Sequence, residues 1–304
     1  MKIQTFRATL KKALDYSKPR PTTASNYEKP QLLQAASSAS IAGFYMMGPA
    51  GAVTQTAATI VGLKIQEKCD NKWLGAAAGA ATGAALAALA GHVTGTPGLA
   101  LQATLGGVGG AFCTLRTNQV SRFRDAGGYG LTFGSPLAQG GAKAALGLSS
   151  VLAAEVQHEG KRAVVAAGLG AATGVALSMT GMNHLSPLVS AAACAGLSVF
   201  ASVCGPRVAM TMRNAGEDIG HKMAKGKPQA DKPQEKSLTS RIIGTIPMAG
   251  LRQSVTAFTM GKFDPISIGV GFAIDASTSA YEVYLNHKHE QEQAAKQNPP
   301  QPPK

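Results

Sequence analysis

Five ionisable side chains lie within apolar stretches of this sequence, and they are the residues that could carry chemistry. An imidazole titrates near neutral pH, so a histidine can move a proton or bind a metal ion. An ionisable residue within a membrane-spanning segment is energetically costly, and it marks a functional site with a polar partner more often than a chance position. The five candidates are His92, His184, Lys143, Arg252 and Asp275.

These candidates have a functional and a structural interpretation. His92 and His184 each lie beside a break between two uncharged runs. In the functional interpretation they form a protonatable or metal-binding pair, and in the structural one they are polar turn residues. We favour the structural interpretation, because the sequence indicates no polar partner for either histidine. Arg252 and Asp275 would partner each other, or would be surface residues of an interfacial or soluble helical pair. Lys143 allows the same two interpretations.

No catalytic or cofactor-binding motif accompanies them. The runs "GLGAATG" and "GGVGG" lack the Lys-Ser/Thr of a phosphate loop, and no Ser-His-Asp or Cys-His set has a supporting context. The histidines of "HKH" at 287–289 are weak evidence for a metal site. We therefore expect no enzyme, no cofactor and no metal. The four cysteines form no Cys-x-x-Cys pair and are expected to be reduced: Cys69, Cys113, Cys194 and Cys204.

The distribution of charge indicates what surrounds these residues. Charged residues are 15% of the 304, against roughly 25% in soluble domains, and the stretches 30–63, 73–115 and 163–206 contain none. Each stretch exceeds the roughly 20 residues of one transmembrane helix. The net charge of +13 therefore lies in connecting segments and tails. This positive charge predicts contact with an anionic bilayer. The sequence lacks the interleaved aromatic and basic residues that are typical of nucleic-acid binding, so we expect no nucleic-acid partner.

An internal repeat organises the apolar region. "GAATGAAL" at 79–86 matches "GAATGVAL" at 170–177, which predicts a duplicated unit spanning about 49–124 and 136–215 within the apolar region 31–215. Each copy is expected to form a helical hairpin. Gly and Pro mark the turns at 94–98 and 183–187, and alanine-rich runs favour helices over strands. The expected helices are 73–92, 99–115, 163–182 and 188–205.

Small residues recur every four positions along these helices. In water each interior glycine costs roughly 1 kcal/mol relative to alanine, whereas in lipid a face of small residues lets two helices approach closely. The spacing therefore favours helix packing in a membrane, and the same faces would support a homo-oligomer. The predicted helix-packing residues are Gly75, Gly79, Gly83, Gly91, Gly106, Gly110, Gly170, Gly174 and Ser178.

The remaining segments are polar. Residues 1–30 are expected to form a basic amphipathic N-terminal helix and a polar leader, not a secretory signal peptide, because no apolar core follows the basic residues. That helix would lie on an anionic membrane or act as a mitochondrial-type presequence. Low apolar content predicts a flexible charged linker at 216–240 and a disordered tail at 285–304. A smaller helical region, 241–284, lies between them.

Together these features predict an all-α polytopic membrane protein built of duplicated Ala/Gly-rich hairpins with glycine-zipper packing. We expect a non-enzymatic protein that permeabilises, remodels or scaffolds a bilayer, in a host-cell or mitochondrial membrane. Marginally apolar spans also suit a secreted bacterial effector or toxin. The alternatives are a solute transporter or channel and a soluble Ala/Gly-rich structural or adaptor protein. The three-repeat mitochondrial carrier signature is not matched, because Ala249 replaces the acid required after Pro247.

Overall fold

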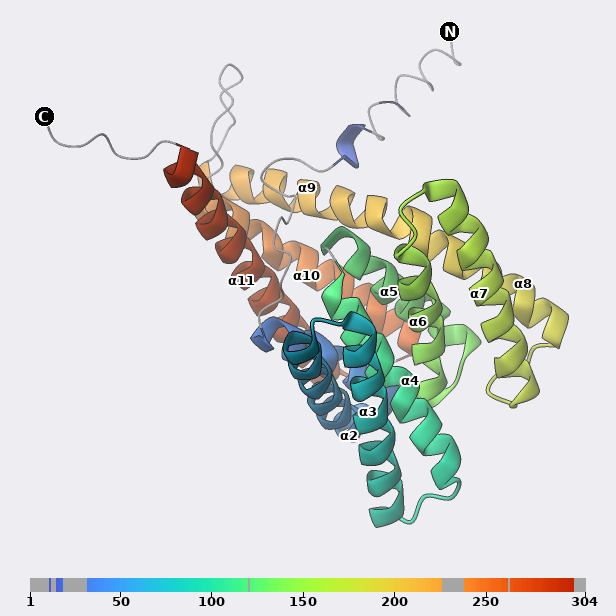
Figure 1. Cartoon of the computed structure of the whole chain (residues 1–304). Coiled ribbons are helices and arrows are strands. Elements are labelled where there is room, and N and C mark those ends of the chain that lie inside the picture. The colour runs from blue at the N-terminus through green and yellow to red at the C-terminus, as the bar shows by residue number, and fades with distance from the viewer. Residues whose placement is uncertain are drawn as a thin grey trace, which may run out of the picture.

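The structure is a computed structural model, and it describes residues 11, 15–18, 32–119, 121–225, 238–261 and 263–297. Within these ranges the chain is almost entirely helical and has no strand, which confirms the all-α prediction (Figure 1). Most of the expected N-terminal helix and leader at 1–30 lies outside the described residues. Tyr16 is described, and its hydroxyl donates a 2.7 Å hydrogen bond to Asp218 Oδ2 on α9 (Gly205–Lys225).

The first long helix, α2 (Leu32–Cys69), folds back on itself. Its backbone leaves the helical region at Met47 and Gly48, where Gly48 has φ +71° just before Pro49. Proline disfavours a helical conformation in the residue before it, and glycine tolerates positive φ. The two halves then pack side by side, because a Cβ on Gly43 would overlap the carbonyl oxygen of Gly51.

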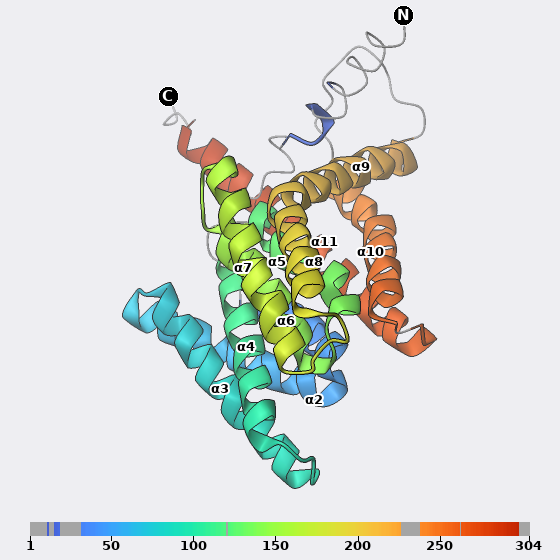
Figure 2. The ribbon, with the colours of Figure 1, turned by 90° about the vertical axis from the view of Figure 1, so that its right-hand side faces the viewer.

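Two helical hairpins follow close to the expected positions. The first joins α3 (Lys72–Val93) to α4 (Leu99–Asn118), and the second joins α7 (Glu159–Met179) to α8 (Pro187–Val199). Asn71 caps α3 by accepting hydrogen bonds from two backbone N–H groups, and proline begins α8, where a missing N–H costs nothing. In Figure 2 both hairpins point their turns away from α9, and the α3–α4 turn lies lowest.

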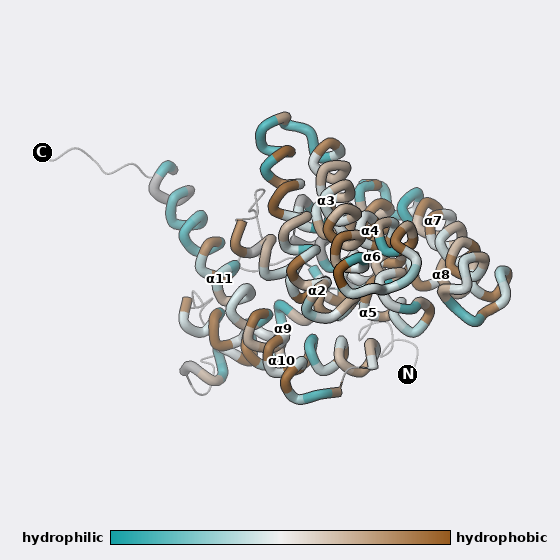
Figure 3. The backbone as a smooth tube through the Cα atoms, turned by 90° about the horizontal axis from the view of Figure 1, so that it is seen from below, coloured by the Kyte–Doolittle hydropathy of each residue, from teal (hydrophilic) through white to brown (hydrophobic). Residues whose placement is uncertain are grey.

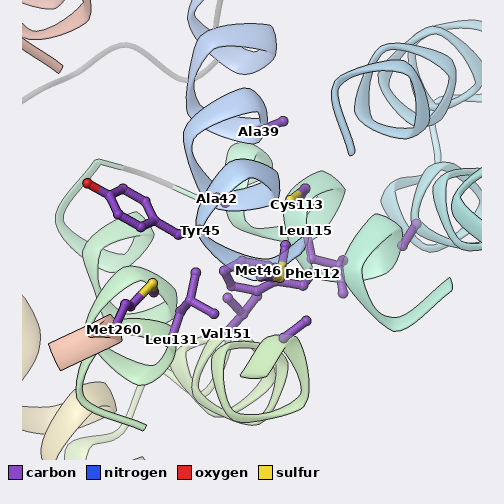
Figure 4. Packing of buried hydrophobic residues seen from close by; sticks show 12 residues of the cluster. Ala39, Ala42, Tyr45, Met46, Phe112, Cys113, Leu115, Leu131, Val151 and Met260 are labelled. Atoms are coloured by element: carbon purple, nitrogen blue, oxygen red, sulfur yellow. The ribbon is translucent and has the colours of Figure 1, made fainter. Parts of the chain in front are cut away.

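A small hydrophobic core lies between the hairpins. It joins α2 and α4 to α5 (Ser121–Gly134) and α6 (Lys143–Ala154), which are connected through the short helices η1 (Ser135–Leu137) and η2 (Gly140–Ala142). Figure 4 shows Met46, Phe112 and Val151 meeting at its centre. Alanine and glycine keep the surrounding helices close, so this core contains few large side chains.

The chain turns sharply after the second hairpin. A single π-helical turn, η3 (Phe200–Cys204), joins α8 to α9, and α9 then crosses the top of the molecule in Figure 2. Helix α10 (Leu238–Met260) packs closely against α9, since a Cβ on Gly220 would overlap the carbonyl oxygen of Ser240. Helix α11 (Pro265–Gln297) completes the described chain.

The segment expected to be a flexible linker and the segment expected to be a disordered tail are both partly helical. The predicted linker 216–240 begins inside α9, and the predicted tail 285–304 begins inside α11. The reason is an ion-pair cluster formed by residues distant in sequence. Arg241 lies 3.0 Å from Glu290 and 3.7 Å from Glu217, so it ties α10 to both helices.

The two hairpins differ in where their helices meet. In the first, Gly83 meets Gly106, 23 residues later, whereas in the second Gly174 meets Ser190, only 16 residues later. The two matching segments lie 91 residues apart, and this offset relates Gly83 to Gly174. It does not relate Gly106 to Ser190, the residues that these two glycines meet. The return helix of the second hairpin is therefore shifted by about two helical turns.

Candidate functional site

The most distinctive surface of the protein is the apolar exterior of the two hairpins. Long apolar side chains on it are widely exposed, including Leu89 at 59%, Val93 at 76% and Leu188 at 82%. Three stretches of the described residues are long and apolar enough to cross a membrane: Lys72–Val93, Glu159–Met179 and Pro187–Met223. The third includes the π-helical bend, so its apolar part is mainly α8. This surface indicates membrane association.

Inside the first hairpin, the predicted glycines contact two neighbouring helices. Gly79 and Gly83 face α4. A Cβ on Gly79 would overlap the Thr114 hydroxyl and lie 3.0 Å from the carbonyl oxygen of Gly110, and a Cβ on Gly83 would overlap the carbonyl oxygen of Gly106. Gly75 instead faces α2, with its Cβ position 2.7 Å from the carbonyl oxygen of Gly62. The four-residue spacing thus places α3 between two partners rather than against one.

The remaining predicted packing residues lie nearer the turns. Gly170 and Gly174 meet the backbones of Cys194 and Ser190 on α8, while Gly91 faces the side chain of Gln102. Ser178 donates a 2.7 Å hydrogen bond to the carbonyl oxygen of Leu185 in the turn. Because the hairpin glycines are occupied within the chain, a homo-oligomer through the same faces would require the hairpins to open.

The two candidate histidines lie in separate hairpin turns. His92 is exposed at the end of α3, and His184 is exposed with its Nε2 2.8 Å from Gln139 Nε2. The turns lie far apart along the chain and end different hairpins (Figure 1). No group of three or more metal-ligating side chains occurs within the part of the chain that the structure describes. Lys143 begins α6 and is half-buried.

Arg252 and Asp275 do pair, and with favourable geometry. The guanidinium donates from Nε at 3.0 Å and from one terminal nitrogen at 2.8 Å to the two oxygens of the carboxylate. Gln253 donates a further bond to Asp275 at 3.0 Å and accepts one from the Tyr45 hydroxyl at 3.0 Å. This chain of bonds joins α2, α10 and α11. Bidentate pairs of this kind combine charge with fixed orientation.

These residues belong to a cavity that sequence reasoning missed. About 450 Å³ of space lies between α2, α5, α9, α10 and α11, a volume in the range of small-molecule sites. Two other ion pairs line it, Arg213 with Asp125 at 3.0 Å and Arg241 with Glu217. The two residues of each ion pair come from different helices, so no local sequence pattern indicates these pairs.

Tyrosines on two walls of the cavity are held neutral. Burial raises the pKa of the Tyr45 phenol, and the carboxylates of Asp264 and Asp275 raise it further. Burial and Asp125 likewise raise the pKa of the Tyr129 phenol above its usual range. Both phenols, which are neutral at physiological pH even at their ordinary pKa, therefore stay neutral to higher pH.

Sequence reasoning also missed the glycine contacts of α9 and α10. Gly216 and Gly220 lie four residues apart and approach the backbone of α10 at Gly244 and Ser240. The same spacing was used to identify the hairpin glycines. The low apolar content of this segment predicts a linker instead, so the sequence does not indicate this helix contact.

Comparisons with known proteins identify no relative of this chain: no family model, no curated protein and no solved structure matches it.

Proposed function

We propose that this chain is a non-enzymatic integral membrane protein that acts by inserting its two apolar hairpins into a bilayer. The observation that carries the proposal is the exposed apolar exterior of α3–α4 and α7–α8, which has no charged residue between Lys72 and Arg116 or between Arg162 and Arg207. A surface this apolar is costly in water, and in acyl chains it is not.

The glycine contacts support a zipper-like role for the predicted packing residues. Lipid supplies no hydrophobic force between helices, so association depends on close van der Waals contact. Gly79, Gly83, Gly170 and Gly174 each lie against a neighbouring backbone, leaving no room for a Cβ. The repeated "GAATG" motif in both hairpins is compatible with duplication followed by a shift of the return helix.

The arrangement of charge supports one orientation. Both hairpins point their turns away from α9 in Figure 2, and away from the hydrophilic C-terminal end of α11, which is teal in Figure 3. The basic segments 64–72, 116–124 and 207–240 would then share one face of the membrane, as the positive-inside tendency expects. Insertion would proceed with the uncharged turns leading.

Such insertion would permeabilise, remodel or scaffold a membrane, and it suits a secreted bacterial effector or toxin that enters a host-cell or mitochondrial membrane. The test is dilution of purified, unfolded full-length protein into anionic phosphatidylglycerol-containing liposomes. We expect carbonate-resistant association, with release of an entrapped dye distinguishing permeabilisation from scaffolding. Protein that stays in the supernatant with a cooperative thermal melt would instead select the soluble alternative.

A second candidate function, solute transport, is favoured by the charged cavity. Ion pairs around a space within a helical protein are typical of substrate pathways in transporters. Saturable uptake of a solute into proteoliposomes without dye leakage would favour transport. Unsaturable leakage would favour the inserting protein.

A further inference from the structure

The cavity between α2, α5, α9, α10 and α11 lies apart from the exposed apolar surface of the hairpins and from their glycine contacts. Its walls combine two kinds of lining. Ile41, Met212, Met248 and Leu251 provide apolar surface, and thioether side chains of methionine adapt to ligands of different shape. Polar groups converge on the remaining wall. This composition is typical of a small-molecule site.

The charges of the lining are almost entirely matched within the protein. Arg213 pairs with Asp125, Arg241 with Glu217, and Arg252 with Asp275. The fourth arginine of the lining, Arg116, is not free either. An anionic ligand would have to displace a carboxylate that the fold already holds in place. The four arginines that line the cavity are therefore poorly placed to bind an external anion.

Glu282 is the exception among these acids. It lies on α11, about two helical turns after Asp275, and it is half-buried with its side chain in the cavity lining. It makes no ion pair or hydrogen bond with another side chain in the described part of the molecule, unlike Asp125, Glu217 and Asp275. A partly buried carboxylate without a partner gains most from a cation supplied from outside.

Aromatic rings add a second feature that favours a cation. Tyr129 stacks on Phe133 with ring centroids 5.7 Å apart, and both rings line the cavity. Tyr45, on α2, also lines it. Ring faces attract an ammonium group, and the attraction grows when water is excluded.

We propose that this cavity binds an organic cation with an apolar body, an alkyl- or arylammonium compound, with Glu282 as the counter-ion. The apolar body lies against the methionine and leucine side chains, and the ammonium group lies at the Glu282 carboxylate. The site lies largely outside the hairpins, because Arg116 at the end of α4 is the one lining residue that a hairpin helix contributes.

The test measures binding of three probes that share a phenyl group to full-length protein in nanodiscs, by equilibrium dialysis against empty nanodiscs. The probes are phenethylammonium, neutral 2-phenylethanol and anionic 3-phenylpropionate. We expect saturable binding of phenethylammonium at least tenfold tighter than that of either other probe. Glu282→Gln should remove this preference and leave the weak binding of 2-phenylethanol unchanged.

Two further variants keep the result interpretable. Glu292→Gln removes an exposed acid from the same helix and should bind phenethylammonium as the natural protein does. Thr132→Phe fills the cavity from α5 without breaking a side-chain hydrogen bond among the described residues, and should reduce phenethylammonium binding at least tenfold. Tighter binding of 3-phenylpropionate, no saturable binding, or unchanged binding by folded Glu282→Gln protein would each overturn the proposal.

Discussion

At the scale of single residues, the glycines of the hairpins differ from one another in what surrounds them. On α7, a Cβ at Gly174 would overlap the carbonyl oxygen of Ser190, whereas a Cβ at Gly168 would meet nothing within 4 Å. The two glycines lie six residues apart on the same helix, so helix propensity treats them alike. Only the position of α8 separates them.

This difference predicts opposite effects of the same substitution. Gly174→Ala should destabilise the protein by about 1–3 kcal/mol, because the added methyl group forces two backbones apart. Gly168→Ala should stabilise it by about 0.5–1 kcal/mol, because alanine is the better helix former and nothing obstructs it. Denaturant titration of the protein in detergent, followed by circular dichroism, measures both. Equal effects of the two substitutions would show that α7 and α8 do not pack as described.

At the scale of the elements, a hairpin in lipid and a hairpin in water respond differently to a surface charge. Leu89 is 59% exposed on α3, and Leu33 is 67% exposed at the start of α2, outside both hairpins. Neither side chain is part of the core, so a lysine at either position leaves the packing of the folded chain largely unchanged. The free-energy cost of the lysine therefore depends on whether its position is surrounded by acyl chains or by water.

Leu89→Lys should therefore impair insertion and Leu33→Lys should not. Moving from leucine to lysine within a span costs about 3–4 kcal/mol on insertion scales. Flotation of the variants with anionic liposomes should show a strongly reduced bound fraction for Leu89→Lys and an unchanged fraction for Leu33→Lys. If both variants float like the natural protein, α3 does not enter the acyl chains.

At the scale of the whole molecule, the charges and the turns define two sides. The exposed Cys69 lies at the end of α2 among basic residues, and Thr96 lies exposed in the uncharged α3–α4 turn. These two positions lie at opposite ends of α3. A protein that inserts with its turns leading must place them on opposite faces of the bilayer.

A membrane-impermeant maleimide can test this arrangement with one cysteine at a time. In liposomes that have received protein from outside, Cys69 should be labelled when it is the sole cysteine. With Thr96→Cys as the sole cysteine, labelling should require detergent. The matched control is complete labelling of both proteins after solubilisation. Equal labelling of both positions in intact liposomes would exclude the proposed topology.

The sequence by itself determined the local features of this protein. Uncharged alanine-rich runs ended by Gly and Pro set the bounds of α3, α4 and α7 to within a few residues, because helix formation and termination depend on neighbouring residues. The same local reasoning placed Arg252 and Asp275 as potential partners, since both interrupt apolar stretches.

Only the tertiary structure decided which distant residues meet. It folded α2 at Gly48, turned Gly75 toward α2 rather than α4, and shifted the return helix of the second hairpin. It also brought Arg241 to Glu217 and Glu290, on helices that extend into the segments expected to be flexible or disordered, and it formed the cavity whose lining includes Glu282. The physical reason is that the gain from such contacts depends on three-dimensional approach, which residue spacing within one helix does not encode.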